Sequence, residues 1–286
     1  MNDPTTWEFN ALGTSWGVAL GRSVPDDLKS AITAELDRID LMWSRFRDDS
    51  TVAEMATTTG RFPIPSSDQP VIDLHRTLYE VTGGMVTPMV GQTLDDAGYD
   101  STYSLRPAEV IAAVPLWDDV LAGWQGELDV VRPVLIDIGA TGKGFAVDRV
   151  ARLVREHGFD EFLVDGSGDI RSGDHPHRIG LEHPTDPTKA IGTVVIENNA
   201  ICASAGNRRA WADWHHIVDP RSGGPTREVL ATWAIAEDTM TADGLATALF
   251  FTSPQKLLSH FDFDYVVVRA NGTVEHSHAR ELELFL

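Results

Sequence analysis

The alternation of two hydrophobic periods along the chain limits the folds that it can adopt. Apolar residues recur every three or four positions from Leu28 to Phe46, directly after Pro25-Asp26-Asp27, and this spacing predicts a long amphipathic helix. Periodic apolar residues, in two places followed by glycine, predict further helices over 71–81, 145–157 and about 242–251, and another begins at residue 254.

Short runs rich in β-branched and aromatic residues predict strands. They are TWEFNAL and SWGVAL, which form a pair around Gly13, and then EFLVDG, HRIGL, GTVVIEN, ATWAIA and DYVVVRA. The last run turns through Asn271-Gly272, a strong hairpin signal. Helices and strands interleave without a regular βαβ repeat. We therefore expect an α+β fold with mixed or antiparallel sheets and packed helices, in a single compact domain over residues 1–286.

Composition excludes several classes of protein. The 286 residues are 42% apolar, which is enough to bury a core, but no run approaches the roughly 18 to 20 apolar residues of a membrane span. The first residues carry neither the basic nor the apolar region of a secretory signal, so we expect a cytoplasmic protein without membrane insertion. The single cysteine, Cys202, excludes an intramolecular disulfide and a multi-cysteine zinc site.

The charge balance argues against some partners. With 23 basic and 43 acidic residues the net charge is −20, and such a surface repels nucleic acid and anionic lipid. Phosphate-bearing ligands would need a local cation such as a bound divalent metal. A simply soluble acidic surface, or an adaptation to salt, explains the same number equally well.

The glycine-rich loop 139–144, GATGKG, fits neither common phosphate-binding pattern. A P-loop needs a glycine where Asp137 stands and a serine or threonine after Lys143, and the dinucleotide fingerprint needs a different glycine spacing. Three glycines, a lysine and the start of a helix nevertheless suit the backbone to an anion. Anion binding and a plain strand-turn-helix corner both remain open from the loop alone.

Two further patterns have both a chemical and a structural interpretation. Asp243 and Thr247 are four residues apart on one face of a helix, and two oxygen ligands at that spacing suit Mg²⁺. An aspartate near a helix start is more often a cap. His215 and His216 precede a rigid Asp-Pro-Arg-Ser-Gly-Gly-Pro turn, so that either histidine could be presented as a proton acceptor or could be structural.

Eight segments in the same order resemble the ApbE family of FAD:protein FMN transferases, and most closely its actinobacterial branch. They are LGTSWGVAL, WSRFRDDSTVAEM, TGGMVTPMVGQTLDDAGYD, DIGATGKGFAVDRVA, FLVDGSGDI, AICASAGNRRAW, HHIVDPRSGGPT and MTADGLATAL. The resemblance covers nearly the whole chain and implies one T-fold-related domain. It also implies a reaction in which FAD is split at its pyrophosphate, FMN passes to a threonine hydroxyl of a target protein, and AMP leaves.

The resemblance assigns a role to each pattern. Asp243 and Thr247 match the family's A-D-x-x-x-T metal signature, and Ala140 stands where the family contributes a backbone carbonyl to Mg²⁺. His216 matches the histidine of H-x-x-D-P and is the expected base, while Asp243 serves catalysis through the metal. Contacts to FAD are expected from Leu12, Phe46, Met85, Val86, Thr87, Asp137, Lys143, His216 and Ile217.

Two of these positions depart from the family pattern. Phe46 stands where the family often has tyrosine, so the ring is kept and a hydroxyl is lost. Thr87 replaces the family's acidic residue in G-x-F-D-P-T, which predicts altered FAD binding.

The resemblance also implies a partner, an acceptor protein with the motif D-x-x-S/T-G/A-A/S-T. The nearest run in this chain, 135–141, has leucine where the motif has aspartate, so we expect no FMN on the chain itself. We expect the protein to be a monomer or a homodimer. Two alternatives use the same residues. One is a Mg-dependent FAD pyrophosphatase that gives FMN and AMP, and the other is a non-catalytic FAD carrier.

Overall fold

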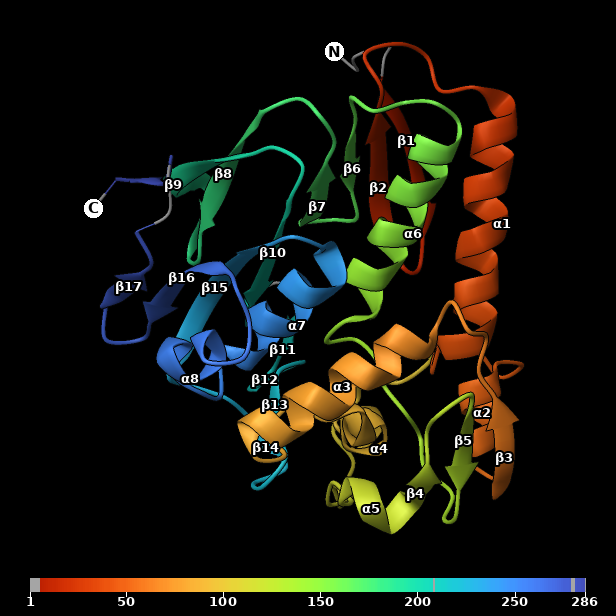
Figure 1. The fold of residues 1–286 in the computed structure, drawn as a ribbon. Coiled ribbons are helices and arrows are strands. Elements are labelled where there is room, and N and C mark those ends of the chain that lie inside the picture. The colour runs from red at the N-terminus through yellow and green to blue at the C-terminus, as the bar shows by residue number, and fades with distance from the viewer. Residues whose placement is uncertain (1–5, 208, 279–280, 286) are drawn as a thin grey trace. The chain divides into compact units, whose positions relative to one another are not determined.

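The computed structural model describes residues 6–207, 209–278 and 281–285 of an α+β protein (Figure 1). Each described strand pairing is antiparallel, as expected for this fold class. Residue contacts divide the chain into two units. Unit 1 comprises 1–37, 143–207 and 228–286, and unit 2 comprises 38–142 and 208–227. Both units are assembled from separated segments, which explains why the sequence shows no boundary; the single-domain assignment stays a prediction.

Unit 1 is built on an eight-stranded sheet. Its strands, in spatial order, are β1 (Thr6–Ala11), β2 (Thr14–Ala19), β6 (Leu163–Asp165), β7 (Asp169–Ser172), β10 (Ala200–Ala205), β15 (Val229–Ala236), β16 (Asp264–Arg269) and β17 (Val274–His276). Both predicted hairpins are confirmed, because β1 pairs with β2 around Leu12-Gly13 and β16 pairs with β17 across Asn271-Gly272.

A second, three-stranded sheet contributes to the core of unit 1. It consists of β8 (His177–His183), β9 (Asp186–Ile196) and β18 (Glu283–Leu284). Buried side chains of β8 and β9, such as Leu181 and Val194, form one apolar cluster with Trp233 of β15. Residues on the opposite face of β15 contact a helix instead, since Thr232 Oγ1 donates to the Ala246 carbonyl at 2.6 Å. Side chains on one face of β15 thus pack against the three-stranded sheet, and those on the other face pack against helix α7.

The helices associated with unit 1 are α1 (Asp26–Trp43), α6 (Gly142–Glu156), α7 (Thr239–Ala248) and α8 (Pro254–Leu258). All four were predicted. The expected extension of α1 to Phe46 is wrong, because the helix ends at Trp43 and Phe46 lies in the segment that follows. Helix α7 packs on β10 and β15.

Unit 2 contains shorter elements. They are α2 (Thr51–Met55), β3 (Gly60–Pro63), α3 (Gln69–Thr82), the 3₁₀ helix η1 (Pro88–Val90), α4 (Gly91–Asp96), α5 (Trp117–Val120), β4 (Leu121–Gly123), β5 (Glu127–Val130), β11 (Ala210–Trp211), β12 (Trp214–His215), β13 (Val218–Asp219) and β14 (Gly224–Pro225). Helix α3 ends as predicted at Gly83, whose left-handed φ of 68° lets its amide bond back to Glu80. Within the described ranges no helix has the length and apolar character needed to cross a membrane.

Candidate functional site

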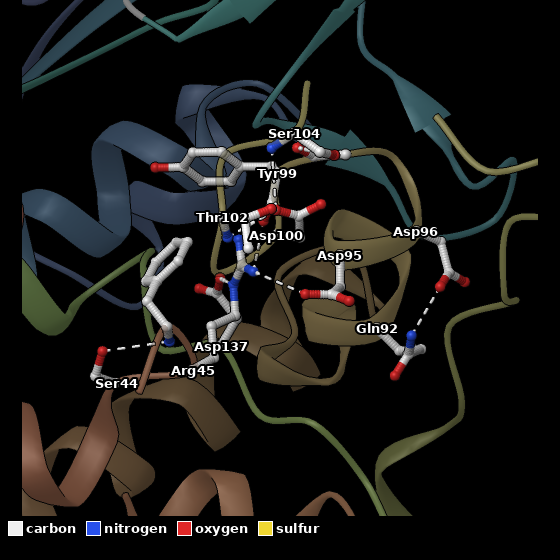
Figure 2. A network of polar contacts seen from close by, with 12 residues as sticks. Ser44, Arg45, Gln92, Asp95, Asp96, Tyr99, Asp100, Thr102, Ser104 and Asp137 are labelled. Atoms are coloured by element: carbon white, nitrogen blue, oxygen red, sulfur yellow. Dashed lines mark hydrogen bonds and ion pairs between the residues drawn. The ribbon is translucent and has the colours of Figure 1, made fainter. Parts of the chain in front are cut away.

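Asp137 belongs to a polar cluster in unit 2 (Figure 2). Its Oδ2 accepts from Arg45 Nε at 2.5 Å, and its Oδ1 accepts from the Gly139 amide at 2.6 Å. Burial opposes the charge of this carboxylate, but the adjacent Arg45 guanidinium outweighs burial and lowers the pKa of Asp137. Asp137 is therefore ionised at neutral pH. A side chain on Gly139 would lie 2.6 Å from Asp137 Oδ1, so this glycine is needed for the contact.

Arg45 connects this carboxylate to a group of aromatic rings. Its Nη1 donates to the Tyr99 carbonyl at 2.6 Å, and its guanidinium carbon lies 4.2 Å from the centre of the Phe46 ring. Phe46 in turn stacks in parallel on Tyr103 with centroids 5.4 Å apart, and Tyr99 stacks on Trp211 at 5.6 Å. Arg45 is only 5% exposed, and its Nη2 is buried without a hydrogen-bond partner among the residues that the structure describes.

The loop that contains Asp137 is supported from helix α3. His75, fully buried, shares a hydrogen bond of 2.9 Å with the hydroxyl of Thr141. Burial lowers the pKa of His75 to about 4, so the ring is neutral at physiological pH. The Asp137 amide also donates to the Pro88 carbonyl at 2.8 Å. These bonds fix the loop that leads to Ala140, which is partly exposed.

The two adjacent histidines have different surroundings. His215 Nε2 lies 2.7 Å from the Thr226 carbonyl, while its Nδ1 accepts from the Ile217 amide at 3.2 Å, so both ring nitrogens are engaged in holding the β12–β14 region. His216 is different, because its Nδ1 is buried without a hydrogen-bond partner in the described ranges. Burial, and then the positive charge of Arg209, lower the pKa of His216 to about 3. The ring is therefore neutral at physiological pH, and in these surroundings it is a weak base.

The segment Met85-Val86-Thr87 is largely buried, with exposed fractions of 7%, 2% and 6%. Thr87 is the N-cap of η1, and its hydroxyl accepts from the Met89 amide at 3.2 Å. Threonine and aspartate both serve as N-caps, so the departure from the family's acidic residue retains this structural role. Ile217 is also buried, and its carbonyl accepts from the Thr226 amide at 3.0 Å.

A second cluster lies in unit 1, where Lys143 begins the unit's second segment. Its Nζ is 2.8 Å from Asp169 Oδ2 and donates to the Ser167 carbonyl at 3.2 Å. Burial opposes the ammonium charge, but Asp169 and then Asp243 attract it and raise the pKa of Lys143. Lys143 and Asp243, both predicted site residues, are thus close enough to interact electrostatically.

Gly144 brings helices α6 and α7 into direct contact. Its amide donates to Asp243 Oδ2 at 3.0 Å, and a Cβ atom on Gly144 would lie 2.3 Å from the Thr239 carbonyl oxygen. A larger residue would therefore separate the helices. The last glycine of GATGKG therefore lets the backbones of α6 and α7 come close together. This contact fixes the position of the Asp243 carboxylate.

The chemistry of the α7 side chains fits a magnesium ion. Asp243 is 5% exposed and Thr247 partly exposed, and they offer a carboxylate and a hydroxyl one turn apart, the hard oxygen donors that Mg²⁺ prefers. No cluster of three or more His, Cys, Asp or Glu residues suited to a metal occurs in the described chain.

Leu12 lies in unit 1, within its first hairpin. It occupies the two-residue turn between β1 and β2 with a φ of 50°, followed by Gly13 at 71°. Two positive φ values suit a hairpin turn, but for leucine this conformation is unusual and strained. The structure places Leu12 in unit 1 and Phe46 in unit 2.

Sequence reasoning missed several residues of these clusters. Arg45, Tyr99 and Asp169 each lie inside a segment that carried the family resemblance, namely WSRFRDDSTVAEM, TGGMVTPMVGQTLDDAGYD and FLVDGSGDI. Their charge or aromatic character inside those segments was the available signal. His75 lies in none of the eight segments, and only the contact with Thr141 reveals it.

The unit 2 cluster, with aromatic rings beside cations and a fixed carboxylate, has the features of a site for an anionic ligand with planar rings. Comparison with known proteins agrees with this class. A model of the ApbE family matches residues 12–266. The chain belongs to the ApbE family.

Individual relatives support the same family. The FAD:protein FMN transferase of Klebsiella pneumoniae (strain 342) is 25% identical, over 98% of this chain and 86% of the relative. That of Haemophilus influenzae is 32% identical over 50% of this chain and 46% of the relative. The ApbE protein from Thermotoga maritima has a TM-score of 0.82 at 25% identity, over 96% of each chain. The flavin transferase ApbE from Vibrio cholerae shares the fold, with a TM-score of 0.77 at 22% identity over 96% of each chain.

Proposed function

We propose that this chain is an FAD:protein FMN transferase. An acceptor threonine oxygen forms a bond to the phosphorus of the FMN half of FAD, the pyrophosphate P–O bond to AMP breaks, and AMP leaves with the bond electrons. Membership of the ApbE family and the names of its relatives support this reaction. The structural observation that carries it is a pair of buried polar atoms in unit 2, Arg45 Nη2 and His216 Nδ1, which lack a protein partner among the described residues.

The aromatic group is suited to the planar rings of FAD. Phe46, Tyr99 and Tyr103 lie against one another, and Tyr103 is 49% exposed, so one aromatic surface remains accessible for stacking. The phenylalanine at position 46 supplies that surface without a hydroxyl. Met85, Val86, Thr87 and Ile217 present little side-chain surface, so their contact with FAD would be made through backbone or through the edges that remain exposed.

The phosphate groups would be held by charged and oxygen-bearing residues. Lys143 offers one cation for phosphate oxygens. Arg45, held by its ion pair with Asp137, offers another. Asp243, Thr247 and the carbonyl of Ala140 would hold Mg²⁺, which when bound neutralises charge on the transferred and leaving phosphates. Leu12 would present the strained β1–β2 turn to the flavin or adenosine part.

His216 is our proposed proton acceptor for the threonine hydroxyl. Its neutral ring has a buried Nδ1 without a partner in the described ranges, whereas both nitrogens of His215 are engaged with backbone groups. A base is most effective when its pKa lies near the working pH. The low pKa of His216 therefore has to rise on substrate binding, and an anion that pairs with Arg209 would remove one of its two main causes.

The remaining assignments complete the proposal. The acceptor is a protein that carries the D-x-x-S/T-G/A-A/S-T motif, and the enzyme works in the cytoplasm as a monomer or homodimer. The net charge of −20 disfavours nucleic acid as a partner.

The test is to incubate the purified protein with FAD, Mg²⁺ and a peptide that carries the acceptor motif, and to weigh the peptide with and without a chelator. We expect a mass gain equal to FMN that the chelator abolishes. Release of FMN and AMP without a peptide adduct would identify a pyrophosphatase instead, and bound but intact FAD would identify a carrier.

Two variants locate the chemistry within this assay. Asp243→Ala should abolish metal-dependent transfer, and His216→Ala should slow it by a factor of about 10² to 10⁴ without a comparable loss of FAD affinity. His215→Ala is the matched control, since it should affect stability more than transfer. A larger loss of transfer in His215→Ala than in His216→Ala would show that the base is assigned to the wrong histidine. Circular dichroism establishes that each variant is folded.

A further inference from the structure

A cavity of about 400 Å³ lies in unit 1, and residues of helix α6, strand β7 and the start of helix α7 line it. Its charged lining includes four arginines, Arg149, Arg152, Arg155 and Arg171. Four guanidinium groups around one cavity contrast with a chain whose net charge is −20. The cavity contains none of the residues assigned above to FAD, metal or proton transfer, and its volume lies in the usual range for small-molecule sites, about 300 to 1,000 Å³.

Three of the arginines have protein partners that use only part of their donor capacity. Arg149 Nε lies 2.5 Å from Glu35, Arg152 Nε lies 3.4 Å from Glu156, and Arg155 Nη2 lies 3.6 Å from Asp174. Arg155 also donates to the Asn198 side chain at 2.9 Å. A guanidinium has five N–H donors, so each of these side chains retains donors for a ligand.

Arg171 is the group that most needs a further partner. Its Nη1 is buried and makes no hydrogen bond with any residue that the structure describes. Burying a donor without an acceptor is unfavourable, and more so when the group is charged. An acceptor oxygen placed in the cavity would remove this penalty.

The carboxylates that line the cavity are directed toward helix α7. Asp148 accepts from the amides of Thr239 and Met240 at 3.0 and 2.8 Å, and Asp238 caps the same helix through the Thr241 amide at 2.7 Å. Both acids interact with Arg171 only as nearby charges, and neither forms an ion pair with a lining arginine in the described ranges. They reduce the positive charge of the cavity but do not satisfy the buried Nη1 donor of Arg171.

The other lining residues are apolar. Phe145 and Phe162 contribute rings, and Ala151 and Met240 complete the apolar surface. The guanidinium of Arg155 lies 5.3 Å from the centre of the Phe162 ring, so cation and ring are adjacent. A ligand that fits must therefore combine an anionic group with a planar apolar body.

We propose that this cavity binds a small phosphate monoester carried on an aromatic ring. A phosphate has three acceptor oxygens and a charge of about −1.5 to −2 at neutral pH, which balances several guanidinium groups better than a single carboxylate does. The aromatic body packs on the phenylalanine rings. The site is separate from FMN transfer and does not depend on that function.

Isothermal titration calorimetry with phenyl phosphate tests this proposal, with benzoate and inorganic phosphate as comparison ligands. We expect one site for phenyl phosphate and weaker binding of both comparison ligands. Arg171→Met should weaken the affinity about 10- to 100-fold, the effect of losing hydrogen bonds from a charged group. Arg152→Met, a change at a more exposed position, should weaken it by a smaller factor and provides a second variant if Arg171→Met does not fold.

The controls separate this site from the catalytic one. Arg178→Met alters an exposed arginine of β8 that pairs with Glu283 at 3.8 Å, and it should bind phenyl phosphate like the wild type. Asp243→Ala should also retain binding, and Arg171→Met should retain FMN transfer. No heat up to roughly 10 mM phenyl phosphate, equal affinity for benzoate, or unchanged affinity in both arginine variants of the cavity would each refute the proposal.

Discussion

Replacing Gly144 by alanine tests the contact that positions the proposed metal ligand. A Cβ atom there would lie 2.3 Å from the Thr239 carbonyl oxygen and 2.8 Å from Asp243 Cβ, and the first of these neighbours is backbone that cannot rotate away. Helix α7 must therefore move relative to α6. That movement would lengthen or break the bond from the Gly144 amide to Asp243 Oδ2, now 3.0 Å.

Three effects determine the change in stability. Alanine in place of glycine within a helix favours folding by about 1 kcal/mol. Overpacking typically opposes it by about 1 to 3 kcal/mol, and a lost hydrogen bond to a charged group by about 1.5 to 3 kcal/mol. The sum predicts a net loss of about 1.5 to 5 kcal/mol, or roughly 3 to 10 °C in melting temperature at about 2 °C per kcal/mol for a chain of this size.

Calorimetry and the FMN-transfer assay together check this expectation. A displacement of about 1 Å in a catalytic group can reduce the rate about 10²-fold, so transfer should fall more than stability alone explains. Gly142→Ala is the matched control in the same helix, because its Cβ would meet side-chain atoms of Ile138, Cδ1 at 2.7 Å and Cγ1 at 2.8 Å, instead of backbone. If Gly144→Ala melts at or above the wild-type temperature, helix propensity dominates and the inferred close approach is wrong.

Two further predictions concern the buried histidines. The pKa of His75 is about 4 in the folded protein and 6.5 in the unfolded chain. The unfolded chain therefore binds a proton first as the pH falls. The contribution of neutral His75 to stability is complete above pH 6.5, and about 3 kcal/mol of it is lost by pH 4. Urea unfolding from pH 7 to pH 4 should show that loss in the wild type but not in His75→Gln, and equal pH slopes in both proteins would contradict it. Arg209→Met should raise the pKa of His216 from about 3 toward 6.5 without reaching it, since burial, the larger cause, remains. An NMR pH titration of the His216 ring measures this, and an unchanged pKa would mean that Arg209 does not influence the ring.

The elements of the fold were predictable where a local signal existed. The turn at Leu12-Gly13, the helix stop at Gly83 and the hairpin at Asn271-Gly272 all appear as expected, because each depends on a few adjacent residues. The end of α1 was not predictable in this way. Phe46 continues the apolar period of the helix, but its neighbour Arg45 bonds to Asp137, 92 residues further along the chain. A contact at that separation leaves no trace in a local hydrophobic pattern.

The site was predictable as a set of residues but not as a set of contacts. The glycines of GATGKG indicated close approaches of backbone, yet only the structure shows that Gly144 meets Thr239 and that Gly139 lies against Asp137. The sequence left His215 and His216 as alternatives. Two backbone hydrogen bonds now give His215 a structural role, and the role of His216 as base stays a prediction.

The low pKa of His216 bears on how such an enzyme would avoid wasting FAD. A ring with a pKa of about 3 is a weak base, and it would activate neither water nor an acceptor hydroxyl efficiently. Burial is a fixed cause of this value, but the charge of Arg209 can be neutralised by a bound anion. The phosphates of the substrate would then strengthen the base only when they are present, and the entering acceptor would exclude the water that competes with it. Substrate binding and proton acceptance would thus be coupled through one arginine of the same unit.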